Sequence, residues 1–463
     1  HIAKAERENF ELRTKDVVPD VLDDHALHIT EHTKLCVSAP CVKDRAFHDR
    51  VSAHIGKHRE LAALGEGVAE LQRRFGGLCV LSQLTKEDKY GYELTDAISR
   101  EMSIAAGTLY MILKRLKEAG YVETYLQESA SGPARKYYHL TEAGTAYQQE
   151  KKQEWLDCAI QGGEFLKKYG HDGNYHWYFS LNRAGNPLVE PYNIFSYTFA
   201  TMAFGQLSLA TGNQEYADIA KKTFDIILSK ADNPKGKWNK IHPGTRNLKN
   251  FALPMILCNL ALEIEHLLNK EYLKKTIETC IHEVMEVFYR PELGGIIVEN
   301  IGVDGNLVDC FEGRQVTPGH DIEAMWFIMD LGKRLNRPDL IEKAKNVTLT
   351  MINYGWDKEY GGIYYFMDRK GCPPQQLEWD QKLWWVHIET LISLLKGYQL
   401  TGDKQCMEWF EKIHEYVWTH FKDAQYPEWF GYLNRQGEVL LPLKGGKWKG
   451  CFHVPRGLYQ CWK

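Results

Sequence analysis

The feature that most constrains the fold of this chain is a helical pattern that repeats from Trp155 onward. In each repeat, apolar residues recur three and four positions apart, as on one face of a helix. The predicted helices cover 155–169, 192–211, 214–230, 249–268, 270–289, 319–336, 338–354, 376–401, 404–421 and 452–463. Because each helix pair buries its apolar face only against neighbouring pairs, the sequence predicts a helical toroid.

Short strand–turn–strand patterns recur between some of the helices. They lie at 175–185, 295–305, 362–371 and 428–437. The tripeptides Thr-Gly-Asn from Thr211 and Thr-Gly-Asp from Thr401 join successive helices. We expect the hairpins on one rim, where their aromatic side chains line a cup for a polar substrate. At least half of these aromatic residues are expected in the core instead.

Two histidines far apart in the chain stand at predicted helix starts, each with a charged residue three positions later. His320 is followed by Glu323, and His453 by Arg456. Residues three apart share a helix face. One histidine can take a proton from one face of a carbon while the other returns a proton to the opposite face. A histidine taken alone is more often structural, but the paired pattern predicts a two-base proton-transfer site.

Further residues are expected to contact the substrate. An arginine can hold a substrate or enediolate oxygen, and His387 adds a third imidazole. The predicted substrate-binding set is Arg314, Trp384, Trp385, His387 and Glu389. No three of the histidines have metal-ligand spacing, so a metal is not required.

Residues 153–463 resemble the N-acylglucosamine 2-epimerase family, whose vertebrate members are also called renin-binding proteins. The resemblance rests on R-Q-V-T-P-G-H-D-I-E-A-M-W-F, Q-L-E-W-D-Q-K-L-W-W-V-H, Y-P-E-W-F-G-Y-L-N-R-Q-G and K-G-G-K-W-K-G-C-F-H-V-P-R. It implies a mainly α fold, an (α/α)6 barrel, and interconversion of N-acetylglucosamine and N-acetylmannosamine through an enediolate. It also implies that His320 and His453 are the acid/base pair, with Glu323 and Arg456 beside them.

The chain departs from the family at the start of the barrel. A closed ring needs twelve helices, and the pattern predicts ten, without the opening two. We therefore expect an incomplete ring with an exposed apolar seam, unless residues 1–154 cover it. Activity would then be impaired, and the chain reads like a fusion or a rearranged reading frame.

Family members are commonly activated by ATP, so the resemblance implies ATP as an allosteric activator of this chain. It implies no cofactor that the reaction requires. A basic, glycine-containing loop after residue 233 could hold phosphates, although it lacks the Walker pattern. A plain solvated loop explains it equally well. The predicted nucleotide-binding residues are Lys235, Lys237, Lys240, Arg246 and Lys249.

Residues 78–152 resemble the winged-helix domain of PadR-family transcriptional regulators. The motifs are Y-G-Y-E-L, G-T-L-Y, L-K-R-L-K-E-A-G-Y and R-K-Y-Y-H-L-T-E-A-G, with a recognition helix at 105–118 and wing strands at 122–127 and 135–140. The implied DNA-binding residues are Thr108, Tyr110, Lys114, Arg115, Arg135 and Lys136. Ten basic residues balance ten acidic ones, so no general attraction to phosphate is expected. The family's long dimerisation helix is not recognisable after Glu150.

Composition separates the remaining N-terminal part. All 13 tryptophans lie at or after Trp155, whereas seven of the 18 histidines precede residue 59. Residues 1–77 are therefore treated as a separate polar, helical segment of unknown role. The stretch from Asp24 resembles the C-terminal helices of phage portal proteins.

The whole chain has the composition of a globular protein, with 44% hydrophobic and 25% charged residues. No apolar run is long enough for a membrane span, and the polar opening residues do not predict a secretion signal. Eleven cysteines without regular spacing are expected as reduced thiols in the cytoplasm. A homodimer and an N-acetyl hexosamine are the expected partners, with DNA as a further one through residues 78–150.

Other functions remain open at this point. A sugar-sensing PadR-like regulator would keep a toroid without catalysis. A cellobiose 2-epimerase or an aldose–ketose isomerase would use similar proton transfer. A glycoside hydrolase would need two carboxylates flanking the scissile bond, and the two-histidine pattern speaks against it.

Overall fold

The computed structural model describes most of the chain from residue 80 onward and little before it. The described residues are 51–52, 54, 77–78, 80–95, 106–129, 132–190, 194–231, 233, 242, 245, 247–423, 425 and 428–462. The predicted segment 1–77 therefore lies almost entirely outside them. The chain divides into unit 1, residues 1–149 with 423–427, and unit 2, residues 150–422 with 428–463. Each unit is described by itself.

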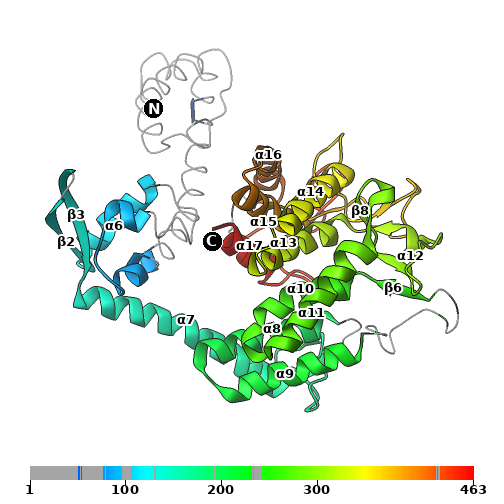
Figure 1. Ribbon diagram of the computed structural model, residues 1–463, viewed down its shortest axis with the longest axis horizontal. Helices are drawn as coiled ribbons and strands as arrows, with labels where there is room; N and C mark the ends of the chain where they lie inside the picture. Colours follow the sequence, from blue (N-terminus) through cyan, green and yellow to red (C-terminus); the bar gives the residue numbers. More distant parts are fainter. Residues whose placement is uncertain are drawn as a thin grey trace. The chain divides into compact units, whose positions relative to one another are not determined.

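Unit 1 contains a helix and a three-stranded antiparallel sheet (Figure 1). Its elements are α6 (Ala106–Glu118), β1 (Lys89–Tyr90), β2 (Val122–Ser129) and β3 (Gly132–Leu140), with strand order β1-β3-β2. The apolar stripe of α6 includes Leu109 and Leu113, both buried. The helix at 105–118 and the two following strands are thus confirmed as elements.

Helix α7 (Glu142–Tyr169) runs without a break across the boundary between the units. The domain division near 152 stays a prediction, but the helix predicted to begin at Trp155 begins at Glu142 instead. Between residues 146 and 157 the chain is rich in Gln, Glu and Lys, which favour helix, and it has no Pro or Gly to stop one. The predicted helix at 155–169 is the second half of α7.

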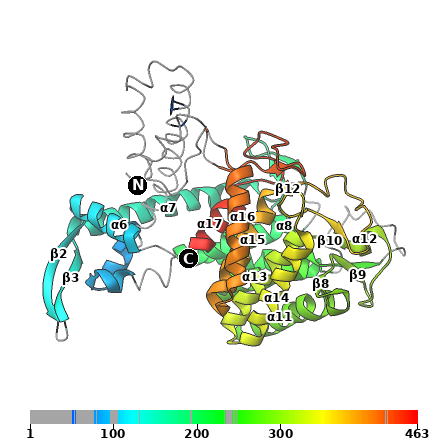
Figure 2. The ribbon, with the colours of Figure 1, turned by 90° about the horizontal axis from the view of Figure 1, so that it is seen from above.

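Unit 2 is built from helices of ten residues or more, shown from two sides in Figures 1 and 2. After α7 these are α8 (Phe195–Thr211), α9 (Gln214–Ser229), α10 (Ala252–Glu263), α11 (Lys270–His282), α13 (Pro318–Arg334), α14 (Pro338–Gly355), α15 (Trp384–Thr401), α16 (Lys404–His420) and α17 (His453–Trp462). Counting α7, the described residues contain the ten helices that the pattern predicted, although α10 and α15 begin later than expected.

The helices alternate between an inner and an outer position. Helix α13 buries 13 of its 17 residues, whereas α16 buries four of 17. The helices α8, α10, α13, α15 and α17 pack each against the next in that order, and α9, α14 and α16 each pack against an inner helix. A helix that is apolar nearly all round belongs in the core, and one with a single apolar face belongs on the outside. This is the predicted (α/α) toroid.

Short strands tie the loops of the toroid together. The pairs are β4 (Ser180–Leu181) with β5 (Pro187–Val189), β6 (Leu248–Asn250) with β9 (Asn300–Gly302), β7 (Tyr289–Arg290) with β8 (Ile296–Ile297), β10 (Gln315–Val316) with β11 (Met367–Asp368), and β12 (Lys382–Leu383) with β13 (Tyr432–Leu433). Strands β6, β10 and β12 lead into the inner helices α10, α13 and α15, and each pairs with a strand from the following loop. The helix starts are therefore held at one rim.

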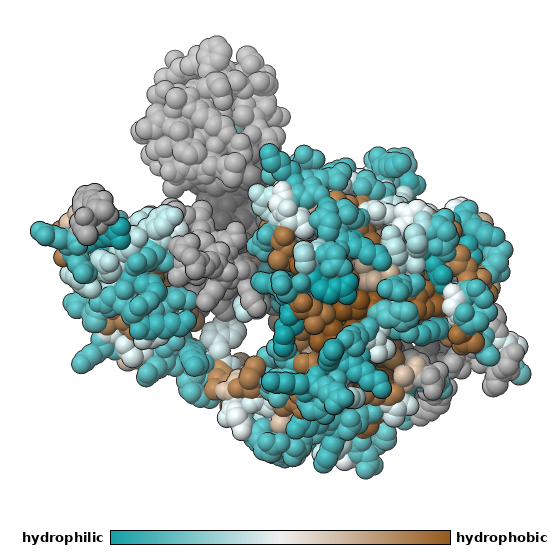
Figure 3. All heavy atoms as spheres, in the orientation of Figure 1, coloured by the Kyte–Doolittle hydropathy of each residue, from teal (hydrophilic) through white to brown (hydrophobic). Residues whose placement is uncertain are grey.

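Apolar side chains are exposed on the two helices where the inner ring begins and ends. They are Phe199 and Leu209 of α8, and Leu458 and Tyr459 of α17. Phe199 contacts Phe452, the residue before α17, with ring centroids 4.7 Å apart. Figure 3 shows a band of hydrophobic residues across one face of unit 2. Among the described helices, none combines the length and apolarity that a membrane span requires.

Candidate active site

His320 lies in the first turn of α13. Pro318 begins the helix, where its fixed φ is favourable and its missing N–H costs nothing. The Nδ1 atom of His320 lies 3.0 Å from Oε2 of Glu299, a buried residue between β8 and β9. Strand pairing at β6–β9 and β10–β11 thus brings a carboxylate from one loop to an imidazole from the next.

His320 and Glu299 each stabilise the charged form of the other. Burial opposes ionisation of Glu299, but His320 and hydrogen bonds from Thr317 and Asn250 lower the pKa of its carboxyl overall. Burial likewise opposes the charged form of His320, yet Glu299 raises the pKa of the imidazole. An ionised carboxylate only accepts hydrogen bonds, so Nδ1 donates. This leaves Nε2 of His320 to take or give a proton.

His453, the first residue of α17, has the same arrangement with Glu389 of α15. Its Nδ1 atom lies 2.7 Å from Oε1 of Glu389, whose side chain is fully buried. The Nε1–H of Trp326 donates to the second oxygen of Glu389 at 2.9 Å. Burial would raise the pKa of Glu389, but Arg456 and His453 lower it. Glu389 therefore orients His453 through Nδ1, and its predicted contact with the substrate stays a prediction.

Arg456 connects two buried glutamates. Its Nη2 donates to Oε1 of Glu323 at 2.9 Å and to Oε1 of Glu389 at 2.6 Å. Burial and the nearby Glu389 charge raise the pKa of Glu323. The Nε and Nη1 groups of Arg456 are buried and have no hydrogen-bond partner within the described part of the chain. These donors are therefore available to an oxygen atom of a ligand.

One indole lies against both histidines. The ring centroid of Trp385 is 5.3 Å from that of His320 and 5.9 Å from that of His453. Trp384 is buried against Tyr432, with centroids 5.2 Å apart. The structure thus brings the predicted acid/base pair, the charged residues beside it and the tryptophan pair into one place at the rim.

The ligand atoms of Glu323, Glu389 and His453 lie within 4.8 Å of one another, a spacing that could hold a metal ion. Arg456 already donates to both carboxylates, however, and Glu389 engages Nδ1 of His453. A metal ion would have to displace this guanidinium. The cluster therefore fits a hydrogen-bonded ion network better than a metal site.

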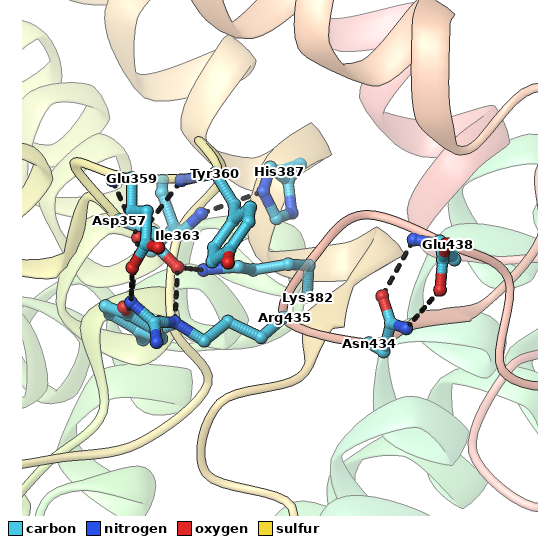
Figure 4. Close-up of polar contacts among 10 residues, drawn as sticks. Asp357, Glu359, Tyr360, Ile363, Lys382, His387, Asn434, Arg435 and Glu438 are labelled. Carbon is cyan, nitrogen blue, oxygen red and sulfur yellow. Dashed lines mark hydrogen bonds and ion pairs between the residues drawn. The ribbon is translucent and has the colours of Figure 1, made fainter.

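His387 and Arg314 lie in other surroundings than predicted. Nε2 of His387 accepts the N–H of Ile363 at 3.0 Å (Figure 4). Nδ1 donates to the carbonyl of Leu383 at 2.7 Å. Burial lowers the pKa of His387 to about 3. Both ring nitrogens are occupied, so His387 supports the fold. Arg314 donates from Nε to Asp368 at 2.8 Å and is similarly committed.

The predicted nucleotide-binding residues Lys235, Lys237, Lys240 and Arg246 lie outside the described residues. Lys249 lies in β6, where it forms an ion pair with Glu283.

The predicted DNA-binding residues lie on α6 and β3 of unit 1. Tyr110 is half-exposed, and Lys114, Arg115, Arg135 and Lys136 are exposed. The side chain of Thr108 lies outside the described residues.

Glu299 was not predicted from the sequence as a site residue. Its only signal is an acidic residue within the 295–305 hairpin, one repeat before His320. Because the spacing between them is 21 residues and crosses a loop, no helix or strand period relates the two. The contact follows only from the pairing of strands between loops.

Comparisons with known proteins agree with this geometry. Residues 114–455 match the family model described as N-acylglucosamine 2-epimerase. The chain is 36% identical to N-acylglucosamine 2-epimerase of Mus musculus over 324 residues, and 37% identical to that of Bos taurus over 325. Each match covers 68% of this chain and 76% of the relative. A solved cellobiose 2-epimerase from Bacillus thermoamylovorans shares the fold, with a TM-score of 0.57, 21% identity, and coverage of 68% of this chain and 83% of that chain. The chain therefore belongs to the N-acylglucosamine 2-epimerase family.

Proposed function

We propose that this protein is a sugar epimerase that interconverts N-acetylglucosamine and N-acetylmannosamine by moving the proton at C2. The observation that carries the proposal is the pair of histidines, His320 and His453, against one indole. Each histidine uses Nδ1 for a buried carboxylate and keeps Nε2 for chemistry. Membership of the epimerase family and the relatives' names support this substrate class.

The reaction follows from these two bases. Nε2 of a neutral histidine takes the C2 proton of the open-chain sugar. The electrons of that C–H bond form a C1–C2 double bond while those of the C1 carbonyl move to O1, which gives an enolate because C2 carries the acetamido group. The second histidine, protonated, then gives a proton to the opposite face of C2. Each turnover leaves one histidine protonated and the other neutral, in exchanged roles. The sugar's oxidation state is unchanged, so no redox cofactor takes part.

Arg456 is the residue best placed to stabilise the enolate oxygen. Its Nε and Nη1 donors are buried and unused among the described residues, while Nη2 is fixed by Glu323 and Glu389. Donors fixed before the reaction stabilise developing charge without reorganising, and one such donor is worth about 3 kcal/mol. The two glutamates thus aim the guanidinium.

ATP enters the proposal as an allosteric activator, with a cytoplasmic homodimer as the working form. Neither is required by the proton-transfer chemistry. Titrating ATP into the assay below tests the first, and light scattering tests the second.

The proposal is tested by incubating the protein with N-acetylmannosamine and ATP in heavy water, followed by proton NMR. We expect loss of the C2 hydrogen signal together with formation of N-acetylglucosamine, and loss of both in His453→Asn. Exchange without epimerisation would mean that only one base works. A folded sample without exchange would contradict the enzyme. Activity on cellobiose and not on the N-acetyl sugar would favour a cellobiose 2-epimerase.

A second candidate is a sugar-sensing regulator of the PadR type with a non-catalytic toroid. It is favoured by the exposed basic residues of α6 and β3 and by the hairpin that follows α6. Sequence-specific DNA binding that responds to N-acetylmannosamine, in a chain without C2 exchange, would support it.

A further inference from the structure

A buried ion cluster outside the catalytic site joins three segments of unit 2 (Figure 4). Lys382 Nζ lies 3.1 Å from Oδ2 of Asp357, and the two side chains are 0% and 1% exposed. Nε of Arg435 donates to the same oxygen at 3.0 Å. One carboxylate therefore holds a cation from β12 and another from the turn after β13.

Asp357 is itself fixed in the turn after α14. Its Oδ1 accepts the N–H groups of Glu359 at 3.0 Å and Tyr360 at 3.3 Å, and its own N–H donates to the carbonyl of Gly362 at 2.9 Å. Burial opposes ionisation of Asp357, but Arg435 and these hydrogen bonds lower the pKa of its carboxyl. The anchor for both cations is thus rigid and charged.

Stability alone gives little reason for such a cluster. Desolvation can cancel the attraction within a buried ion pair, and an apolar side chain of similar volume often serves as well. Burial lowers the pKa of Lys382 to about 8, even though Asp357 acts in the opposite direction. The alternative to a stabilising role is that the cluster fixes the positions of the segments it joins.

The cluster lies next to Trp384 and Trp385. Lys382 pairs with Leu433 in the β12–β13 ladder, and β12 runs directly into α15, which begins at Trp384. The N–H of Trp384 donates to the carbonyl of Gly431 at 3.1 Å. The next residue, Trp385, is the indole that contacts both histidines. Fixing the two strands therefore fixes where this indole stands.

We propose that Asp357, Lys382 and Arg435 are positioning residues that hold Trp385 between the two histidines. They would thereby set how often a proton removed from one face of the sugar is replaced on the other. This inference rests on the proposed epimerase function and adds residues that touch neither the substrate nor the histidines.

The test is the ratio of deuterium exchange into recovered N-acetylmannosamine to formation of N-acetylglucosamine in heavy water. This ratio is a property of each active molecule and does not depend on how many molecules are folded. Lys382→Met fills the space and leaves Asp357 paired with Arg435. We expect it to change the ratio severalfold while the unfolding midpoint stays near that of the wild type.

Lys345→Met is the matched control. Lys345 is a buried lysine, 5% exposed, that pairs with Asp403 at 2.7 Å between α14 and the start of α16. We expect this variant to keep the wild-type ratio. A wild-type ratio in Lys382→Met, with exchange and epimerisation lowered in parallel, would overturn the positioning role.

Arg435→Met serves if Lys382→Met does not fold. The Arg435 side chain is 33% exposed, and its removal keeps the Lys382–Asp357 pair intact. The same change in ratio is expected, and an unchanged ratio would again overturn the inference. A wild-type chain without any exchange would instead remove the epimerase function itself, so the two failures are distinguishable.

Discussion

At the residue scale, the two histidines that we propose as acid and base, His320 and His453, share one arrangement. Each stands in the first turn of an inner helix and gives Nδ1 to a carboxylate from a different loop or helix. A helix N-terminus is electropositive and disfavours imidazolium. At His320 the carboxylate of Glu299 counters this effect, so that the pKa of the imidazole is raised overall. The local sequence thus places each histidine at a helix start, and contacts from other segments set its hydrogen bonding and charge.

The first prediction concerns this tuning. Glu299→Gln removes the charge that raises the pKa of His320, so that pKa should fall. His320 must be protonated whenever it is the proton donor. With a lower pKa, it loses that proton at a lower pH than in the wild type. We expect the basic limb of the kcat/KM profile to move to lower pH, with a smaller kcat. An unmoved basic limb would show that Glu299 does not control His320.

The second prediction concerns Arg456. Arg456→Met leaves Glu323 and Glu389 buried without their shared cation, which should cost about 3–5 kcal/mol of unfolding free energy. Loss of its unused donors should lower kcat about 10²- to 10³-fold. Arg456→Lys restores one charge but not the planar donors, so stability should recover more than kcat. Equal recovery of both would contradict a direct role in the reaction.

Arg334→Met is the control for this variant. Arg334 pairs with Glu265 at 3.0 Å, but both side chains are exposed. Such a surface pair is worth at most about 1 kcal/mol, so denaturant unfolding should change little. A large loss here would mean that the stability assay does not separate buried from exposed pairs.

The sequence predicted the central residues of the site but not their partners. Each charged residue lies three positions from its histidine on one helix, which periodicity can show. The two pairs meet, however, through the contact of Arg456 with Glu323, which spacing does not show. Glu299 approaches His320 only through strand pairing between loops. His387 was predicted to contact the substrate beside two tryptophans, yet its ring nitrogens bind the backbone. Spacing along the chain does not tell these cases apart.

At the element scale, the helix links follow from local chemistry. In the link after α8, Gly212 adopts φ 71°, in the left-handed region that favours glycine, and Asn213 then caps α9 by accepting the N–H of Glu215. Gly402 and Asp403 repeat this between α15 and α16. Such links were predictable because glycine and the capping residue act on their own neighbours. The continuity of α7 could not be predicted, because no local sequence signal marks a boundary between two units that falls inside a helix.

The third prediction tests these caps. Asn213→Ala removes the side-chain acceptor at the start of α9 and should cost about 1 kcal/mol of unfolding free energy. Helix α9 is an outer helix, so the epimerisation rate of the folded protein should not change. Asn213→Asp keeps the acceptor and should stay near the wild type. A loss as large in the aspartate variant would exclude capping as the cause.

At the scale of the whole molecule, the ring depends on contacts between repeats. Ten helices could be predicted because each repeat has a helical period of apolar residues and several are followed by a hairpin pattern. The contacts between the first and last helices of the ring could not be predicted in this way. Phe199 of α8 meets Phe452 just before α17, two residues that are 253 positions apart. The same contact lies next to His453, so the packing of α8 against the start of α17 and the placement of the second histidine are linked.

The last prediction concerns the acid stability of this whole unit. Burial lowers the pKa of His387 from 6.5 to about 3, so the unfolded chain binds a proton below about pH 6.5 that the folded chain does not. Stability is therefore lost as pH falls, with a limiting slope of about 1.4 kcal/mol per pH unit. His387→Asn keeps a donor and an acceptor without this titration, and its stability should fall less steeply. Because all 13 tryptophans lie at or after Trp155, their fluorescence reports this unit during denaturant unfolding. Parallel pH curves for the two proteins would show that His387 is not the group that couples folding to pH.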